Sequence, residues 1–196
     1  MDTEVVRGSC LCGSVQYELR GQLGPVYCCH CRNCQKATGS AFAPLLAIES
    51  SRFRWVSGGE LITGHTSSGE TGGVTRWSCS QCGSALGLVS SVPEFQDSCG
   101  ILVGTLDDTA DLKLWGHEWV SSQPPWFKLH DELPAFEGYP PAAYFSAAAK
   151  GPLSPDLELA LAKSPRAVMR CGSCDAAYPA GLEKCSKCGA GLPASQ

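Results

Sequence analysis

The sequence predicts an all-β fold of short antiparallel strands. Short runs rich in apolar and β-branched residues recur along the chain, turn residues separate them, and helical periodicity is almost absent. The 196 residues include 22 glycines and 13 prolines, which is typical of a chain with many turns. This length suggests one domain, or one domain with an appendage.

The first expected strand covers Val15–Leu19, in which apolar and polar residues alternate. A tight turn at Gly8–Gly13 precedes it and carries the thiols of Cys10 and Cys12. Later runs also suit strands, with Gly-Gly and Asp-Asp pairs among the turn signals between them. These runs are Phe42–Ile48, Phe53–Val56, Glu60–His65, Val74–Cys79, Ala85–Val89, Cys99–Thr105 and Leu112–Val120.

The segment Cys28-Cys29-His30-Cys31-Arg32-Asn33-Cys34 holds four thiols in seven residues. A hydrophobic core does not produce this pattern, and adjacent cysteines bridge each other only with strain. We therefore expect a metal-binding loop in which several sulfurs converge on one ion. One helical turn from Cys34 to Thr38, stopped by Gly39, is expected to follow.

The last third of the sequence changes character. Residues 124–127 and 133–141 are proline-rich and aromatic, which predicts ordered irregular chain lying over the sheets. From residue 144 the composition becomes small and Ala/Pro-rich, with a helix start at Ser154. We expect a β-domain at 1–143, a linker with a short helix at 144–168, and a zinc ribbon at 169–196.

The expected zinc ribbon contains two Cys-x-x-Cys pairs separated by ten residues, which is a strong signal for a metal site. About 25 residues cannot bury a core alone, so the ion must supply the folding free energy. Rubredoxin-like iron is the alternative, and the short intervening segment favours zinc. The predicted ligands are Cys171, Cys174, Cys185 and Cys188.

Composition weighs against several classes of function. The formal net charge is -4 and no Lys/Arg cluster occurs, which argues against nucleic acid as the main partner. The acidic start lacks the apolar segment of a signal peptide, and no apolar run approaches the roughly 18 residues that span a bilayer. We therefore expect a cytoplasmic protein, in which 13 cysteines favour metal binding over disulfides.

Two half-sites, Cys10-x-Cys12 and Cys79-x-x-Cys82, together offer four sulfurs for a closed tetrahedral zinc site. This site would be structural, because it joins the first strand to a central hairpin some seventy positions away. The alternative is that these four cysteines are unpaired buried thiols.

The close spacing of Cys29, Cys31 and Cys34 predicts a second metal site, with three sulfur ligands and no obvious fourth. Three protein ligands indicate an open, catalytic-type zinc site, whose fourth position takes water or a substrate thiolate. Motifs of four, three and four thiols give about three zinc ions per chain. The alternative is a closed structural site completed by one of Cys28, His30 and Cys99.

Residues around this loop are candidates for substrate contact. Arg32, Asn33 and Lys36 can meet substrate carboxylates, with an ordinary solvated face as the alternative. Trp126, with Phe127, is a candidate pocket wall, with core packing as the alternative.

The histidines are assigned separately. His117 is a candidate proton shuttle near the loop, with a hydrogen-bonded structural histidine as the alternative. His30 alternates with the predicted ligands, so we expect its ring to point away and to orient the loop. His65 and His130 are assigned to surface or structural positions.

Three thiol motifs at fixed places resemble those of the glutathione-dependent formaldehyde-activating enzyme family, which includes the centromere protein V relatives. The motifs are GSCLCGSVQY at 8–17, CHCRNCQKATG at 29–39 and CSQCGS at 79–84. The stretches Gly104–Asp108, His117, Pro125-Trp126 and Leu133–Gly138 match in the same order, so the resemblance covers roughly residues 5–141.

The resemblance implies an Mss4-like β-fold and the activity for which the family is named. That activity joins glutathione to formaldehyde to give S-hydroxymethylglutathione, a carbon–sulfur lyase reaction read in reverse. The C-terminal ribbon lies outside the family's usual extent and Cys28 adds a thiol, but neither departure removes a ligand. The implied zinc ligands are Cys10, Cys12, Cys79 and Cys82 for the structural ion, and Cys29, Cys31 and Cys34 for the second.

The second site has a chemistry that suits a thiol substrate. A zinc ion with three thiolates carries net negative charge, so it favours a soft fourth ligand over an activated water. A thiol bound there loses its proton and becomes the nucleophile, ready to attack a small carbonyl. Two other functions remain open: a non-catalytic zinc scaffold or protein-interaction module, and a metal or redox sensor acting through Cys28.

Overall fold

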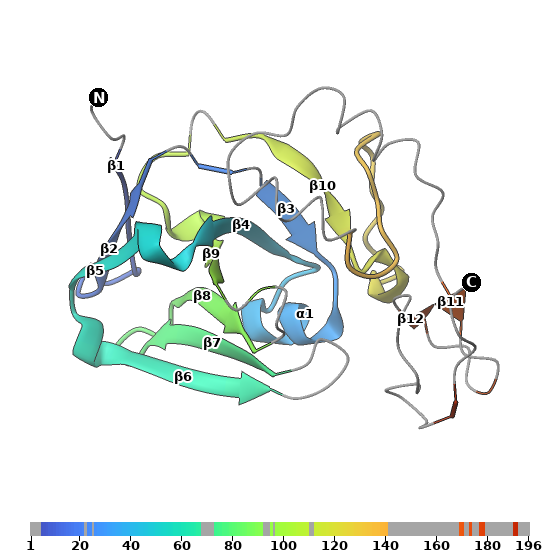
Figure 1. Ribbon diagram of the computed structural model, residues 1–196, viewed down its shortest axis with the longest axis horizontal. Helices are drawn as coiled ribbons and strands as arrows, with labels where there is room; N and C mark the ends of the chain where they lie inside the picture. The colour runs from blue at the N-terminus through green and yellow to red at the C-terminus, as the bar shows by residue number, and fades with distance from the viewer. Residues whose placement is uncertain are drawn as a thin grey trace.

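The computed structural model describes residues 5–21, 23–24, 26–67, 73–91, 95, 97–109, 112–140, 169–170, 173, 177–178 and 190–191. These residues form sheets of three, seven and two strands (Figure 1), with one α-helix in the part of the chain that is described. The expected all-β fold is therefore confirmed.

The smaller of the two main sheets is antiparallel and has the strand order β1-β2-β5. Its middle strand buries Tyr17 and Leu19 on one face and presents Glu18 on the other, as strand alternation requires. Glu18 lies opposite Arg7 and Arg54 in the two neighbouring strands. The strands are β1 (Val5–Ser9), β2 (Gln16–Arg20) and β5 (Phe53–Ser57).

The larger sheet has the strand order β10-β3-β4-β9-β8-β7-β6. Every pairing in it is antiparallel except that of β10 with β3, which is parallel. The strands are β3 (Val26–Cys29), β4 (Ala43–Glu49), β6 (Ile62–Ser67), β7 (Val74–Cys79), β8 (Ala85–Ser90), β9 (Ser98–Leu102) and β10 (Leu114–Glu118).

Strand β4 is buried on both faces and separates two apolar clusters. Leu46 and Ile48 pack with residues of the smaller sheet in one cluster, which is the core shared by the two sheets. Leu45 and Ala47 point the other way, into a second cluster that also contains three cysteines. The candidate site therefore rests on the far face of the sheet that forms the core, and a rigid, buried strand supports it.

The helix α1 (Arg32–Thr38) begins two residues earlier than expected and ends at Gly39, as expected. Its N-cap is Cys31, whose sulfur accepts a hydrogen bond from the backbone N–H of Cys34. A cysteine is an unusual cap, so cap preferences do not predict this start. Short 3-10 helices lie at η1 (Ser50–Arg52), η2 (Gly59–Leu61), η4 (Val103–Thr105) and η5 (Val120–Ser122).

Strands β1 and β3 are not among the strands expected from the sequence. β1 runs into the expected turn at Gly8–Gly13, and β3 runs into the expected metal loop at Cys28–Cys34. All four residues of β3 are buried, so the run lacks the alternation of a half-buried strand. The expected strand at 99–105 ends at Leu102, where η4 takes over.

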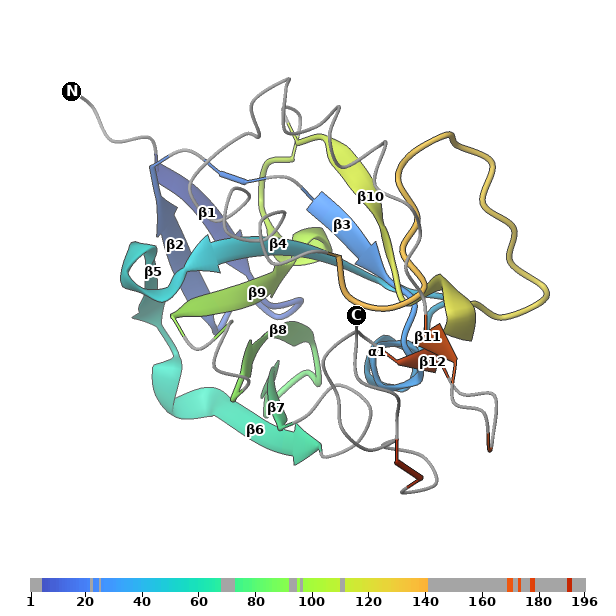
Figure 2. The same cartoon turned by 45° about the vertical axis from the view of Figure 1, so that its right-hand side comes forward.

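The chain after β10 returns along this edge strand. Backbone hydrogen bonds join His117 to Pro134 and Phe136, and Trp119 to Gly138. Figure 2 shows this return as a long loop that passes beside β10. Residues 134–138, within the irregular segment expected at 133–141, thus cover an open sheet edge, which would otherwise expose unpaired backbone groups.

The third sheet pairs β11 (Met169–Arg170) with β12 (Ala177–Tyr178) in antiparallel register. The predicted ribbon ligands Cys171, Cys174, Cys185 and Cys188 lie outside the described residues, as does the predicted linker at 144–168. The division into 1–143, 144–168 and 169–196 therefore stays a prediction. No helix within the described ranges is both long and apolar enough to cross a membrane.

Candidate metal centres

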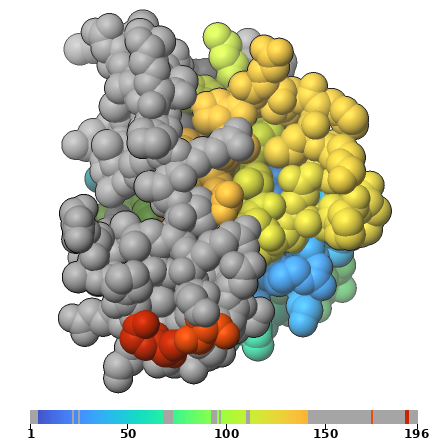
Figure 3. Space-filling model, turned by 90° about the vertical axis from the view of Figure 1, so that its right-hand side faces the viewer, coloured from blue at the N-terminus to red at the C-terminus, as the bar shows by residue number. Residues whose placement is uncertain are grey.

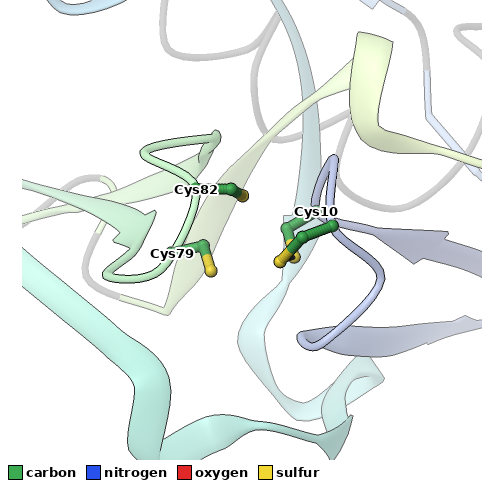
Figure 4. A group of neighbouring side chains, drawn as sticks. Cys10, Cys79 and Cys82 are labelled. Carbon is green, nitrogen blue, oxygen red and sulfur yellow. Dashed lines mark hydrogen bonds between the residues drawn. The ribbon is translucent and has the colours of Figure 1, made fainter.

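The first candidate centre joins two loops that are far apart in the sequence. The sulfur atoms of its four cysteines all lie within 4.8 Å of one another. Figure 4 shows the labelled thiols pointing toward one another from the turn after β1 and the turn after β7. The cysteines brought together are Cys10, Cys12, Cys79 and Cys82.

The two loops of this centre have the same backbone plan. Gly13 donates its N–H to the carbonyl of Cys10 at 2.9 Å, and Gly83 donates to that of Cys79 at 2.8 Å. Both glycines have positive φ, 74° and 73°, which is the left-handed region that glycine enters without steric cost. Each turn therefore presents two sulfurs to the same point.

The second candidate centre consists of Cys29, Cys31 and Cys34, whose sulfur atoms lie within 4.8 Å of one another. Cys29 ends strand β3, Cys31 caps helix α1, and Cys34 lies in the first turn of that helix. All three are buried and belong to the second apolar cluster. The change from strand to helix within three residues is what brings these sulfurs together.

Hydrogen bonds among these three thiols lower the pKa of Cys31 and raise that of Cys29. The thiols of Cys29 and Cys34 hydrogen-bond to Cys31 and hold its pKa well below the ordinary value. The pKa of Cys29 is raised, chiefly because of its hydrogen bonds with Cys31 and Cys34 and then because of burial. A thiolate is thus stabilised at Cys31, and a thiolate is the form that binds a metal.

Arg76 adds a positive charge to this centre, and sequence reasoning missed it. Its Nη2 lies 3.8 Å from the sulfur of Cys34, and Nη1 donates to the Ser67 hydroxyl at 2.7 Å. The guanidinium also helps to lower the pKa of Cys31. Arg76 belongs to β7 and lies far from the three thiols in sequence, so its contact with Cys34 could not be predicted from local spacing.

The candidates for a fourth protein ligand lie elsewhere. Among the described residues, the group around the three sulfurs contains no further His, Cys, Asp or Glu. Burial raises the pKa of both Cys28 and Cys99 to about 12, so these thiols stay neutral. Cys99 packs in the core shared by the sheets, as expected for a buried small hydrophobe.

His30 and His117 form a hydrogen-bonded chain with Asp131. His30 Nε2 lies 3.0 Å from His117 Nδ1, and His117 Nε2 lies 3.1 Å from Asp131 Oδ2. Burial is the main cause that lowers the pKa of His30 to about 4, so its ring is neutral at pH 7. Neither histidine belongs to the group of ligand atoms around the three sulfurs.

Gln35, a buried residue of α1, ties this region together. Its Nε2 donates to the carbonyl of His30 and to that of Ser122, the latter at 2.8 Å. Figure 3 shows residues that follow β10 beside those of α1 at the surface.

The predicted substrate-contact residues lie at the surface. Arg32 and Lys36 are exposed on α1, and the Arg32 guanidinium donates to the side chain of Gln35. Asn33 is half-buried on the same helix. Trp126 is 73 % exposed and meets Phe127 edge to face, so it is not a core residue.

A buried acid beside the three thiols was also missed. Glu118 ends β10 and pairs in register with Cys29 of β3. Burial raises the pKa of Glu118 to about 8, while a hydrogen bond with the Cys29 thiol opposes this shift. The contact arises from the parallel pairing of β10 with β3, across about ninety residues of sequence, which no local pattern predicts.

Both candidate centres fit a soft or borderline metal ion. Four clustered thiols match a closed structural zinc site, and three match a zinc site with one position left for another ligand. Hard ions such as Ca²⁺ and Mg²⁺ prefer oxygen, and sulfur ligands do not suit them.

The chain is similar to a known protein family and to a solved structure. A family model described as "Glutathione-dependent formaldehyde-activating enzyme" matches residues 5–122, which is more than half of the chain. A crystal structure of a Rhodobacter sphaeroides protein is similar at 22% identity and a TM-score of 0.44, covering 57% of this chain and 98% of that one. No curated protein matches the chain.

Proposed function

The chain belongs to the glutathione-dependent formaldehyde-activating enzyme family, and from this premise we propose that it is a zinc-dependent carbon–sulfur lyase-type enzyme. Its substrates are a small thiol and a small carbonyl compound, of which glutathione and formaldehyde are the pair that the family name specifies. The product of that pair is S-hydroxymethylglutathione. The expected cytoplasmic location and a protein partner of the C-terminal ribbon remain predictions.

The observation that carries the proposal is the set of three buried sulfurs at Cys29, Cys31 and Cys34. No fourth ligand comes from the residues that the structure describes. Because a closed structural site needs four protein ligands, this arrangement favours an enzyme over a scaffold. A zinc ion held there supplies a Lewis acid that lowers the pKa of an incoming thiol.

The chemistry then needs little further activation. The thiolate sulfur forms a bond to the carbonyl carbon, the π electrons of the C=O bond move to oxygen, and that oxygen takes up a proton equivalent to the one the thiol lost. Arg76 offsets the negative charge of the sulfurs. Arg32, Asn33, Lys36 and Trp126 remain proposed contacts for the rest of the thiol substrate.

The remaining assignments concern the other metal sites and His117. We propose one zinc ion on the four cysteines Cys10, Cys12, Cys79 and Cys82, and one in the C-terminal ribbon, which makes about three ions per chain. His117 remains a proposed proton shuttle, which would have to act through His30, its partner at 3.0 Å.

Cys31→Ser tests this function, with Cys28→Ser as a matched control, because Cys28 is a buried thiol of β3 outside the group of three sulfurs. We expect Cys31→Ser to lose one zinc ion per chain, glutathione binding and adduct formation while it keeps its folded circular dichroism spectrum. Cys28→Ser should keep all three properties. Full zinc retention in Cys31→Ser would count against the proposed centre.

A further inference from the structure

Two buried polar atoms next to the three-thiol centre have no hydrogen-bond partner among the described residues. They are Oε2 of Glu118 and Nε1 of Trp119. Each side chain is only 3% exposed, so bulk solvent has almost no access to them. Nearly all buried polar atoms in folded proteins are paired, and an unpaired donor and acceptor on adjacent residues therefore require an explanation.

Glu118 lies beside the sulfurs without joining them. Its carboxyl hydrogen-bonds to the Cys29 thiol, and its backbone pairs with that residue. Among the described residues it is nevertheless outside the group of ligand atoms that lie within 4.8 Å of one another. The carboxyl is therefore suited to contact a molecule bound at this centre, and not to serve as a metal ligand itself.

Trp119 is held in an unfavourable backbone conformation. Its φ of 57° is the one positive value at a non-glycine residue within the described ranges. Such strain in a bulky residue persists only where the surroundings enforce it, and it gathers at functional sites. The backbone N–H of Trp119 donates to the carbonyl of Gly138 at 3.1 Å. Its indole meets the ring of Tyr139 edge to face, with the ring centroids 5.1 Å apart.

The indole of Trp119 also shares an apolar cluster with Cys29, Cys31 and Cys34. The strained turn after β10 thus places this ring in the cluster that holds the three thiols, while the indole N–H is left without a protein acceptor among the described residues. The apolar cluster that holds the three thiols therefore also holds the indole with its unpaired donor, and the carboxyl with its unpaired acceptor hydrogen-bonds to one of these thiols.

We propose that Trp119 and Glu118 bind the oxygen of the hydroxymethyl group as it forms. The inference rests on the proposed function. The indole N–H donates to the oxygen, and the Glu118 carboxyl hydrogen-bonds to the hydroxyl proton. A hydroxyl is both donor and acceptor, and a carboxyl group can bond to it in either protonation state. A fixed donor at this position stabilises the negative charge that develops on oxygen during attack.

Trp119→Phe removes the N–H and keeps an aromatic ring. We expect adduct formation to slow at least about tenfold, while glutathione affinity and zinc content are not reduced. Some thermal stability is lost because the smaller ring leaves a cavity in the cluster, so the rate is compared at a temperature where both proteins are folded. Trp55→Phe is the control, because Trp55 packs between Phe53 and Trp77 in the core.

Glu118 is tested by a pair of variants. Glu118→Gln keeps hydrogen-bonding capacity and should retain most of the rate, whereas Glu118→Leu should lose about tenfold. Glu60→Leu is the control at an exposed position. Rates in Glu118→Leu and Trp119→Phe equal to that of the wild type would overturn the inference.

Nuclear magnetic resonance gives a second readout, which is recorded on the wild-type protein. The five tryptophans give five indole N–H resonances, which single Phe variants assign. That of Trp119 should shift when glutathione and formaldehyde are added together, and not with glutathione alone. An unmoved resonance in an active wild-type enzyme sinks this inference only, whereas an inactive wild-type enzyme sinks the proposed function and this inference with it.

Discussion

At the scale of the residue, the site depends on side chains that sequence spacing does not connect. The three thiols lie within six positions of one another, and their grouping follows from the motif alone. Arg76 and Glu118 reach the same centre from β7 and β10, through strand pairings that only the fold specifies. The cluster of three thiols is therefore predictable from the sequence, and the residues that contact it from other strands are not.

Arg76 is expected to strengthen metal binding at the three-thiol centre. Without its guanidinium, protons compete better for the thiols, because the charge of Arg76 lowers the pKa of Cys31. We predict that Arg76→Leu weakens zinc binding there about tenfold, which corresponds to about 1.4 kcal/mol, and that Arg76→Lys is milder. Competition with a zinc chelator measures this affinity.

The matched control for this prediction is Arg7→Leu, which removes an exposed guanidinium in β1, outside the second apolar cluster. If both variants release zinc at the same chelator concentration as the wild type, Arg76 does not affect zinc binding at the three-thiol centre.

At the scale of the element, the alternation of apolar and polar residues predicted the half-buried strands. It did not predict a strand that is buried on both faces. β7 runs from Val74 to Cys79, as the pattern indicated. β3 was missed, because its four residues are all buried and its cysteines suggested a loop. The parallel pairing of β10 with β3 could not be read from local sequence, since nothing in either strand specifies its partner.

The turn at Gly83 should be sensitive to substitution for a reason confined to the backbone. An added Cβ meets no atom within 4 Å, so packing does not oppose it, but φ is 73°. We predict that Gly83→Ala costs about 1–2 kcal/mol and that Gly83→Asn costs less, because Asn tolerates the left-handed region. Chemical denaturation of the zinc-loaded protein measures both, and equal stability of all three proteins would contradict this account.

The sheet β1-β2-β5 should show a pH-dependent contribution from Glu18. A hydrogen bond from Arg54, at 2.7 Å, is the main cause that lowers the pKa of this carboxyl, with Arg7 contributing. A lowered carboxyl pKa stabilises the fold above the ordinary pKa, and this stabilisation disappears as the pH falls through the lowered value.

We therefore predict that Glu18→Gln is less stable than the wild type near neutral pH. The difference should shrink as the pH is lowered below about 5. Thermal melts of both proteins across this range test the prediction, and comparing the two cancels the effects of acid on the metal sites. A difference that stays constant with pH would refute it.

At the scale of the whole molecule, we expect the first candidate metal centre to stabilise the fold and the second to bind the substrate. The first joins turns some seventy residues apart, across two sheets that share one core. The second lies within six residues of chain, on the far face of the larger sheet. Only the first can restrict the unfolded chain over a long loop, which is where cross-links stabilise most.

Loss of a ligand from each centre should therefore have unequal consequences. We predict that Cys12→Ser lowers the free energy of unfolding by about 4 kcal/mol, comparable with loss of a cross-link over a loop of this length. Cys31→Ser should lose its zinc ion at a much smaller cost in stability, yet lose activity. Denaturation and zinc quantitation on the two variants make the comparison. If Cys31→Ser were the less stable variant, the three-thiol centre would be the structural one, which contradicts this account.

The central claim is that the ion at Cys29, Cys31 and Cys34 has a fourth position open to a thiol. X-ray absorption at the zinc edge, recorded with and without glutathione, tests it directly, because the difference spectrum isolates the one centre that changes. The account predicts that a light-atom neighbour at about 2.0 Å is replaced by a sulfur at about 2.3 Å. Identical spectra with saturating glutathione would contradict it.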